Sequence, residues 1–238
     1  MTSSPDYTMR TSPNYMAGAL MAANAVSDAL LVYRGSACVE EQVVQTFAPH
    51  DLGHGMSVNR AEGRLVLTMD PETVSLMGAA QSALKAARWG LQTRQVRVVL
   101  LSELIRHSLT GENIRRLSEQ LEAELGVPCV ATDADVLDRD FGDSTRSIMD
   151  GLARAAVERA PEAPLAEGSV AAVGYLRSRN EGDSDGDNAE LRRILAGGGL
   201  ELCSTWLSGG TWEELLEATR AQTIVGPPFA GNAARLLA

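Results

Sequence analysis

The chain has 238 residues, 45% of them hydrophobic and 22% charged, so it is long enough and apolar enough to bury a substantial core. It carries 21 Lys and Arg residues against 31 Asp and Glu residues, and the resulting net charge of -10 disfavours binding to nucleic acid or to an anionic membrane surface. Only 4% of the residues are aromatic, so the core must consist mainly of Ala, Val, Leu and Ile.

The sequence carries no pattern of a membrane-inserted or secreted protein. No apolar run approaches the roughly 20 residues that a membrane-spanning helix needs, and residues 1–15 lack the charged-then-apolar order of a signal peptide. Three cysteines, Cys38, Cys129 and Cys203, are too few and too scattered for a disulfide framework. We therefore expect a cytoplasmic protein.

Helices and apolar strands alternate through the first part of the chain. Residues 1–15, rich in Ser, Thr and Pro, are expected to form an arm. The pattern then predicts a small-residue helix over 16–31 that closes into an apolar stretch over 30–33. A strand over 64–69 and a helix capped by Asp70 and ending near Gly90 are expected to follow. The remaining elements of this part are predicted to be strands over 96–101 and 128–132 and helices over 113–126 and 144–160.

The alternation restarts after a linker predicted over 161–168. The later elements are expected to be a strand over 169–176, helices over 189–196 and 212–221, strands over 200–205 and 223–225, and a helix from about Asn232. Near-continuous apolar strands alternating with helices are typical of parallel sheets covered on both faces. The sequence therefore predicts an α/β fold of two doubly wound, Rossmann-like, three-layer α/β/α domains over residues 16–165 and 166–238.

The sequence offers little support for nucleotide binding or for a catalytic triad. It contains neither a G-x-G-x-x-G after the first strand nor a P-loop, so no motif supports nucleotide binding. Its G-x-S-x-G at residues 182–186 falls in the Asp- and Gly-rich loop before the helix predicted over 189–196, and its three histidines offer little material for a catalytic triad.

Three segments are candidates for binding metal. His50 and His54 could pair on a helix, but the surrounding Pro and Gly residues favour a polar loop. The acidic run over 183–187 lacks the Gly and Glu positions of a calcium loop, and we interpret Asp187 as a helix cap. Cys38 follows an apolar strand and a Gly-containing turn, where a side chain can face a cleft, although a lone cysteine is more often a buried small hydrophobe. Cys129 and Cys203 lie within strands and are interpreted as core residues.

Several segments match one family in their order and spacing. Gly18-Ala19 precedes an apolar stretch and the turn YRGSAC, and LSELIRHSLTGENIRRLSEQLEAELGVPCVATD combines a strand, a Gly-Glu-Asn-Ile helix start and a strand after Val-Pro. The segment from GYLRSRNEG to GNAARLL adds a Gly-Leu strand, a Ser-Gly-Gly turn and a strand before a last helix. Together these segments resemble the nitrogenase component 1 family, which includes nitrogenase molybdenum–iron protein subunits, cofactor-assembly scaffolds and dark-operative protochlorophyllide reductases.

The resemblance implies an oxidoreductase subunit that pairs with a homologous subunit, shares an iron–sulfur cluster at the interface and is served by an ATP-dependent iron–sulfur reductase. Cys38 matches the family's turn cysteine and is therefore the expected metal and cluster ligand. An earlier family cysteine has no counterpart near Tyr15, and a later one is replaced by Ser102 or Glu103, which makes Glu103 the second candidate ligand. Because one thiolate cannot hold a cluster, a partner must supply most ligands, or oxygen ligands such as Glu40, Glu41 or Glu103 must substitute.

Two further departures from the family lead to an alternative hypothesis. The family's cavity lies among three α/β domains, so the second domain here is expected to be incomplete or to be followed by a third. The strand that carries a cofactor-binding cysteine in catalytic subunits ends here in Val225-Gly226-Pro227-Pro228, without a thiol. The alternative is a non-catalytic assembly, scaffold or binding module that keeps the fold without a complete metal site.

Overall fold

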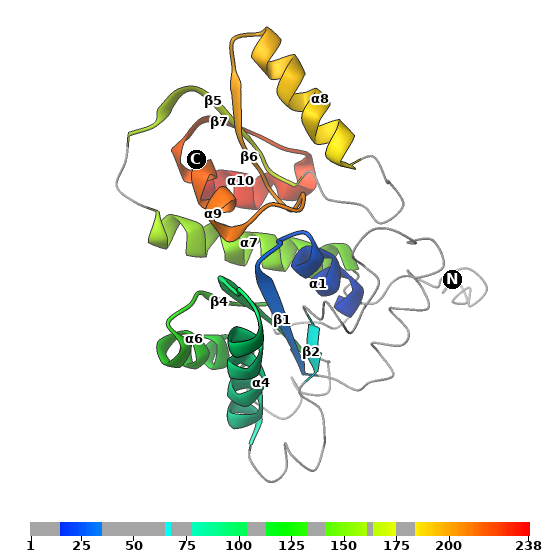
Figure 1. The fold of residues 1–238 in the computed structure, drawn as a ribbon, viewed down its shortest axis with the longest axis vertical. Helices are drawn as coiled ribbons and strands as arrows, with labels where there is room; N and C mark the ends of the chain where they lie inside the picture. The colour runs from blue at the N-terminus through cyan, green and yellow to red at the C-terminus, as the bar shows by residue number, and fades with distance from the viewer. Residues whose placement is uncertain are drawn as a thin grey trace, which may run out of the picture.

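A computed structural model describes residues 15–34, 65–67, 78–103, 113–132, 141–160, 164–174 and 184–238. These residues form two parallel β-sheets flanked by helices, which confirms the predicted α/β, Rossmann-like architecture (Figure 1). The first sheet contains β1 (Ala29–Arg34), β2 (Leu65–Leu67), β3 (Val98–Glu103) and β4 (Cys129–Ala131) in the spatial order β2-β1-β3-β4. The second contains β5 (Ala166–Ala172), β6 (Glu201–Thr205) and β7 (Ala221–Val225) in the order β6-β5-β7.

Helices cover both faces of the first sheet. On one face lie α1 (Tyr15–Asn24) and α7 (Phe141–Arg159), and on the other lie α4 (Ala79–Thr93) and α6 (Ile114–Leu125). Because side chains alternate along a strand, Leu31 and Tyr33 of β1 pack on the α1 and α7 side, whereas Leu30 and Val32 pack on the α4 and α6 side. Every residue of β1 and β3 is buried, as expected for central strands of a parallel sheet.

The second sheet is flanked by three helices and two 3₁₀ turns among the described residues. They are α8 (Ser184–Gly197), α9 (Trp212–Leu216), the 3₁₀ turns η2 (Glu217–Arg220) and η3 (Pro228–Ala230), and α10 (Gly231–Leu237). Helix α9 begins with a capping box, in which the Thr211 hydroxyl accepts the Glu214 N–H and the Glu214 carboxylate accepts the Thr211 N–H.

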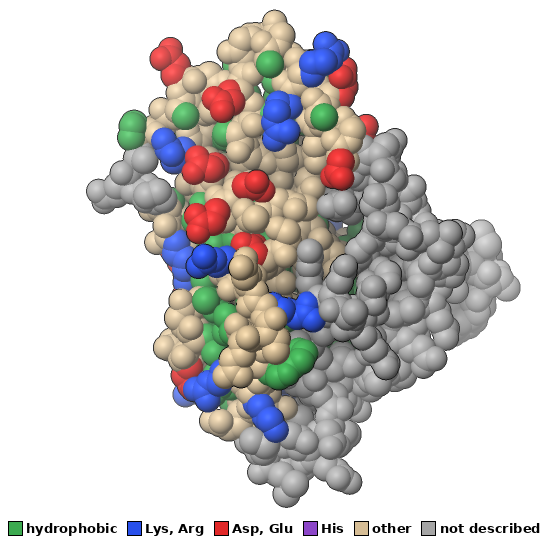
Figure 2. Space-filling view, in the orientation of Figure 1, with side chains coloured by type: hydrophobic (Ala, Val, Ile, Leu, Met, Phe, Trp, Pro, Cys, Tyr) green, Lys and Arg blue, Asp and Glu red, His purple; other side chains and the backbone are tan. Residues whose placement is uncertain are grey.

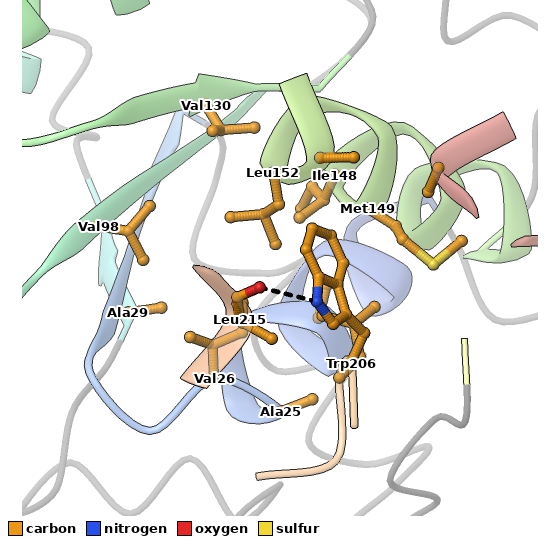
Figure 3. Close-up of a cluster of buried hydrophobic side chains, with 14 of the residues drawn as sticks. Ala25, Val26, Ala29, Val98, Val130, Ile148, Met149, Leu152, Trp206 and Leu215 are labelled. Atoms are coloured by element: carbon orange, nitrogen blue, oxygen red, sulfur yellow. Dashed lines mark hydrogen bonds between the residues drawn. The ribbon is translucent and has the colours of Figure 1, made fainter. Parts of the chain in front are cut away.

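Helix α7 packs between the two sheets, so the sheets share one apolar core (Figure 1). Ile148, Met149 and Leu152 of α7 are fully buried in this core together with residues of both sheets and of α10. The indole of Trp206 lies among them and donates its Nε1–H to the Leu215 carbonyl at 3.1 Å (Figure 3). The proposed domain boundary between residues 165 and 166 stays a prediction, because this core is continuous.

Several predicted boundaries need correction. The helix predicted over 16–31 ends at Asn24, and β1 begins at Ala29. Helix α8 begins at Ser184, so the prediction that Asp187 caps it is wrong; Asp185 and Asp187 lie in its first turn, where the helix dipole favours acidic residues. The helix predicted over 212–221 is α9 followed by η2. Strand β5 begins at Ala166, inside the predicted linker, and Asp70 lies outside the described residues.

Among the described residues, no helix combines the length and the apolar character that crossing a membrane requires.

Gly226, directly after β7, packs tightly on the end of β5. The Val173 N–H donates to the Val225 carbonyl at 2.8 Å, and a Cβ on residue 226 would overlap the carbonyl oxygen of Val173. We expect Gly226→Ala to lower the free energy of unfolding by about 1–3 kcal/mol, because overpacking forces the backbone to shift. Gly186→Ala in α8 is the matched control: a Cβ on residue 186 would meet no atom within 4 Å, so we expect a change of about 0 to +1 kcal/mol. Equal urea unfolding curves for the two variants would refute this account.

Asp28 ties α9 to the start of β1. Its Oδ1 accepts the Trp212 N–H at 2.8 Å, and the neighbouring backbone adds bonds from Ser27 N–H to the Gly210 carbonyl and from Gly209 N–H to the Ala25 carbonyl, both 2.8 Å. Burial raises the pKa of the Asp28 carboxyl above its ordinary value, although the bond from Trp212 acts in the opposite direction.

This pKa shift predicts a pH dependence of stability. The folded chain holds the Asp28 proton more tightly than the unfolded chain, so the contribution of Asp28 is fully present below pH 3.8 and is lost as the pH rises through the raised pKa. Asp28→Asn keeps an acceptor for the Trp212 N–H without titrating. We therefore expect the unfolding free energy of the variant, minus that of the wild type, to be larger at pH 7 than at pH 4 in urea titrations. A difference that stays constant or shrinks with pH would count against the shift.

Candidate functional site

The centre of the first sheet is a topological switch point. The chain leaves β1 for β2 on one side and then returns to form β3 on the other side of β1. In open parallel sheets, ligands bind outside the carboxyl ends of the strands at such a reversal. The carboxyl ends of β1 and β3 are therefore the first place to look for a site.

Arg34 and Glu103 are the last residues of these two strands and face each other in the strand register. The Arg34 Nη1 donates to the Glu103 Oε2 at 2.9 Å, and only 2% and 0% of the two side chains are exposed. Both continue the series of side chains that faces α4 and α6, after Val32 and Leu101. The switch point thus carries a buried ion pair.

A second polar contact lies on the opposite face of the sheet, at the ends of β3 and β4. The Thr132 hydroxyl donates to the Ser102 hydroxyl at 3.4 Å, and both side chains are buried. The Thr132 N–H also continues the β3–β4 ladder by donating to the Leu101 carbonyl at 2.9 Å. The two hydroxyls therefore place oxygen donors and acceptors on the α7 side of the described part of this edge.

The residues predicted as ligands are only partly described. Glu103 lies at the carboxyl end of β3, as a site residue should, but its partnership with Arg34 was not anticipated from the sequence. Cys38, Glu40, Glu41, His50 and His54 lie outside the described residues. Within the described ranges, no group of three or more His, Cys, Asp or Glu side chains could hold a metal ion.

Of the two described cysteines, Cys129 is a buried core residue, as predicted, whereas Cys203 is only partly buried and packs against the core. Cys129 is buried at the start of β4, and its thiol contacts the Val127 carbonyl at 3.5 Å. Cys203 is half-buried in β6, where its thiol donates to the Val170 carbonyl at 3.3 Å. Burial raises the pKa of both thiols, that of Cys129 from 9.0 to about 12.

A groove of about 440 Å³ runs between α6 and α7 over the edge strand β4. Glu122 spans it: one carboxylate oxygen accepts the Cys129 N–H at 3.0 Å, and the other pairs with Arg159. Arg159 also contacts Glu158 at 3.4 Å. Figure 2 shows both acidic and basic side chains on the described part of the viewed face. We interpret the groove as the polar junction of α6 and α7, which covers an edge strand.

Among the described residues, the segment just after β5 packs closely on η3 and on the turn after β7. Gly174, two residues past β5, has a φ of 85°, and a Cβ there would lie 2.5 Å from the Ala230 Cβ. A Cβ on Gly226 would likewise lie 3.6 Å from the Ala230 Cβ.

Comparison with solved structures identifies the fold. The chain is similar to nitrogenase Cp1 in structures at pH 6.5 and pH 5, with TM-scores of 0.66 and 0.68. The similarity covers 94% and 96% of this chain at 14% sequence identity. It covers only 43% and 45% of the nitrogenase chains, so this chain spans less than half of their length. No family model matches the sequence, and no curated protein is significantly similar to it.

These comparisons establish a relation to nitrogenase component 1 at the level of the fold. The fold that the sequence motifs suggested is thus confirmed, whereas the roles of Cys38 and Glu103 stay predictions.

The raised pKa of Cys129 predicts slow alkylation. A pKa of about 12 in place of 9.0 leaves about a thousandfold less thiolate at pH 8, and burial restricts access of the reagent further. In a pulse of iodoacetamide followed by peptide mass spectrometry, we expect Cys129 to react far more slowly than the half-buried Cys203. In denaturant the two rates should converge. Equal rates in the native protein would show that β4 does not bury the thiol.

Proposed function

We propose that this chain is a subunit of a nitrogenase-like oxidoreductase that takes part in ATP-coupled, low-potential electron transfer to a substrate together with a partner subunit. The observation that carries the proposal is the fold, which matches nitrogenase Cp1 over 94% of the chain. The ordered motifs from Gly18 to the last helix support the same family, and a cytoplasmic location is part of the proposal.

The proposed partners are a homologous subunit, which would form a homo- or hetero-oligomer with this chain, and an ATP-dependent iron–sulfur reductase. A homologous subunit is proposed because this chain supplies too few cysteine ligands for a cluster. Iron–sulfur clusters take about four thiolates, and Cys38 is the residue of this chain that matches a cluster cysteine of the family. The other thiolates would come from across the interface.

The described residues at the carboxyl edge of the first sheet do not fit a cluster by themselves. Ser102 and Thr132 are hydroxyl donors, and the Glu103 carboxylate is engaged by Arg34. Iron–sulfur clusters favour soft thiolates over such oxygens. A cluster, which would carry single electrons at low potential, therefore depends on Cys38 and a partner in this proposal.

A second candidate function is a non-catalytic assembly, scaffold or binding module with the same fold. The Arg34–Glu103 ion pair favours this second function, because the Arg34 guanidinium contacts the carboxylate that the resemblance suggested as a cluster ligand. In this case the chain would keep the surface for its partner and hold no redox-active metal.

Iron content separates the two candidates. We expect the chain purified anaerobically with its partner to contain iron and to absorb visible light, and Cys38→Ser to remove most of the iron without changing helix content. Cys203→Ser is the matched control, because that thiol donates to the Val170 carbonyl within the second sheet and should not affect iron.

An iron-free, colourless complex would favour the assembly module over the oxidoreductase. If Cys38→Ser instead lost its helical circular dichroism, Cys38 would be a core residue.

A further inference from the structure

The Arg34–Glu103 pair lies where β1 and β3 end side by side at the switch point. The two residues are directly opposite in the parallel register and point to the same face, so the strand geometry itself brings their charges together. Their side chains are almost completely removed from solvent, at 2% and 0% exposure.

A metal ion at Glu103 would disturb this arrangement. Whichever oxygen of the Glu103 carboxylate bound the metal, the Arg34 guanidinium that donates to Oε2 would lie, buried, beside a second cation. Because repulsion between buried like charges is strong and desolvation of a metal ion is costly, this arrangement opposes ligation.

The described thiols cannot complete a site around Glu103 either. Cys129 pairs with Val99 in the register, four residues before Glu103 on β3, which places the thiol and the carboxylate roughly 13 Å apart along the strand direction. Cys203 belongs to the second sheet.

We infer that Glu103 is the structural counter-ion of Arg34, that the pair clamps β1 to β3 at the switch point, and that Glu103 does not ligate a metal ion or cluster. This assignment corrects the role suggested for Glu103 by the family resemblance. The assignment does not depend on the proposed oxidoreductase function, because its test compares the iron content and the thermal midpoint of each variant with those of the wild type.

The test is a double-variant cycle on the full chain with Glu103→Gln, Arg34→Met and both changes together. Each protein is incubated anaerobically with ferrous iron and sulfide and desalted, and bound iron per chain and the thermal midpoint are then measured. Glu124→Gln is the matched control, because Glu124 forms an exposed pair with Arg88 at 3.2 Å between α4 and α6.

Each single change at the buried pair should lower the midpoint by on the order of 10 °C, because it leaves one buried charge unpaired. The double variant should lose less than either single variant, and Glu124→Gln should change the midpoint by less than about 3 °C. Iron per chain should equal the wild-type value in Glu103→Gln and in the double variant, whether that value is high or zero.

A fall in bound iron in Glu103→Gln or the double variant, with the fold retained, would overturn the assignment. Additive losses of the midpoint, or a double variant that fails to fold, would overturn the clamp. If Glu103→Gln alone does not fold, the iron content of the double variant shows whether Glu103 ligates the metal.

Discussion

The apolar contact of α7 with both sheets is the constraint on which the rest of the structure depends. Ile148, Met149 and Leu152 occupy a core that extends from β1 and β3 on one side to β5 and α10 on the other. Because closely packed interiors resist displacement, this helix fixes the two sheets relative to each other. The position of each carboxyl edge follows from that packing.

The switch point shows how such a scaffold presents charged groups. Two apolar strands hold their last residues in register, and the fold around them removes Arg34 and Glu103 from water. Buried ion pairs are costly unless their geometry is good, and here the strand register supplies the geometry. The fold is similar to that of nitrogenase Cp1, and the described residues at this edge provide an ion pair and two hydroxyls. Similarity of this fold to nitrogenase Cp1 therefore does not by itself imply the same chemistry at this edge.

Much of the fold could be predicted from the sequence, because strands such as β3 begin with a continuous apolar run, here residues 98–101, between clear helix signals. Boundaries were less predictable: α8 extends to Ser184 because acidic residues are favourable in its first turn, although they resemble a loop in the sequence. The partnership of Arg34 with Glu103 could not be predicted, since it depends on which strands are neighbours and in which register. Charged residues at the ends of two apolar strands are the signal that could have suggested it. The burial of Cys129 was predictable from its strand, whereas the Glu122 bond to its N–H was not.

We propose that this chain acts in a nitrogenase-like complex whose metal depends on assembly, because one cysteine matching the family's cluster ligands cannot hold a cluster alone. Anaerobic size-exclusion chromatography with continuous iron detection distinguishes assembly-dependent iron from iron bound by the chain alone. We expect iron to elute with oligomeric assemblies and to be absent from the 25.3 kDa monomer. Iron in stoichiometric amounts in the monomer peak, or no iron in any assembly, would refute the proposal.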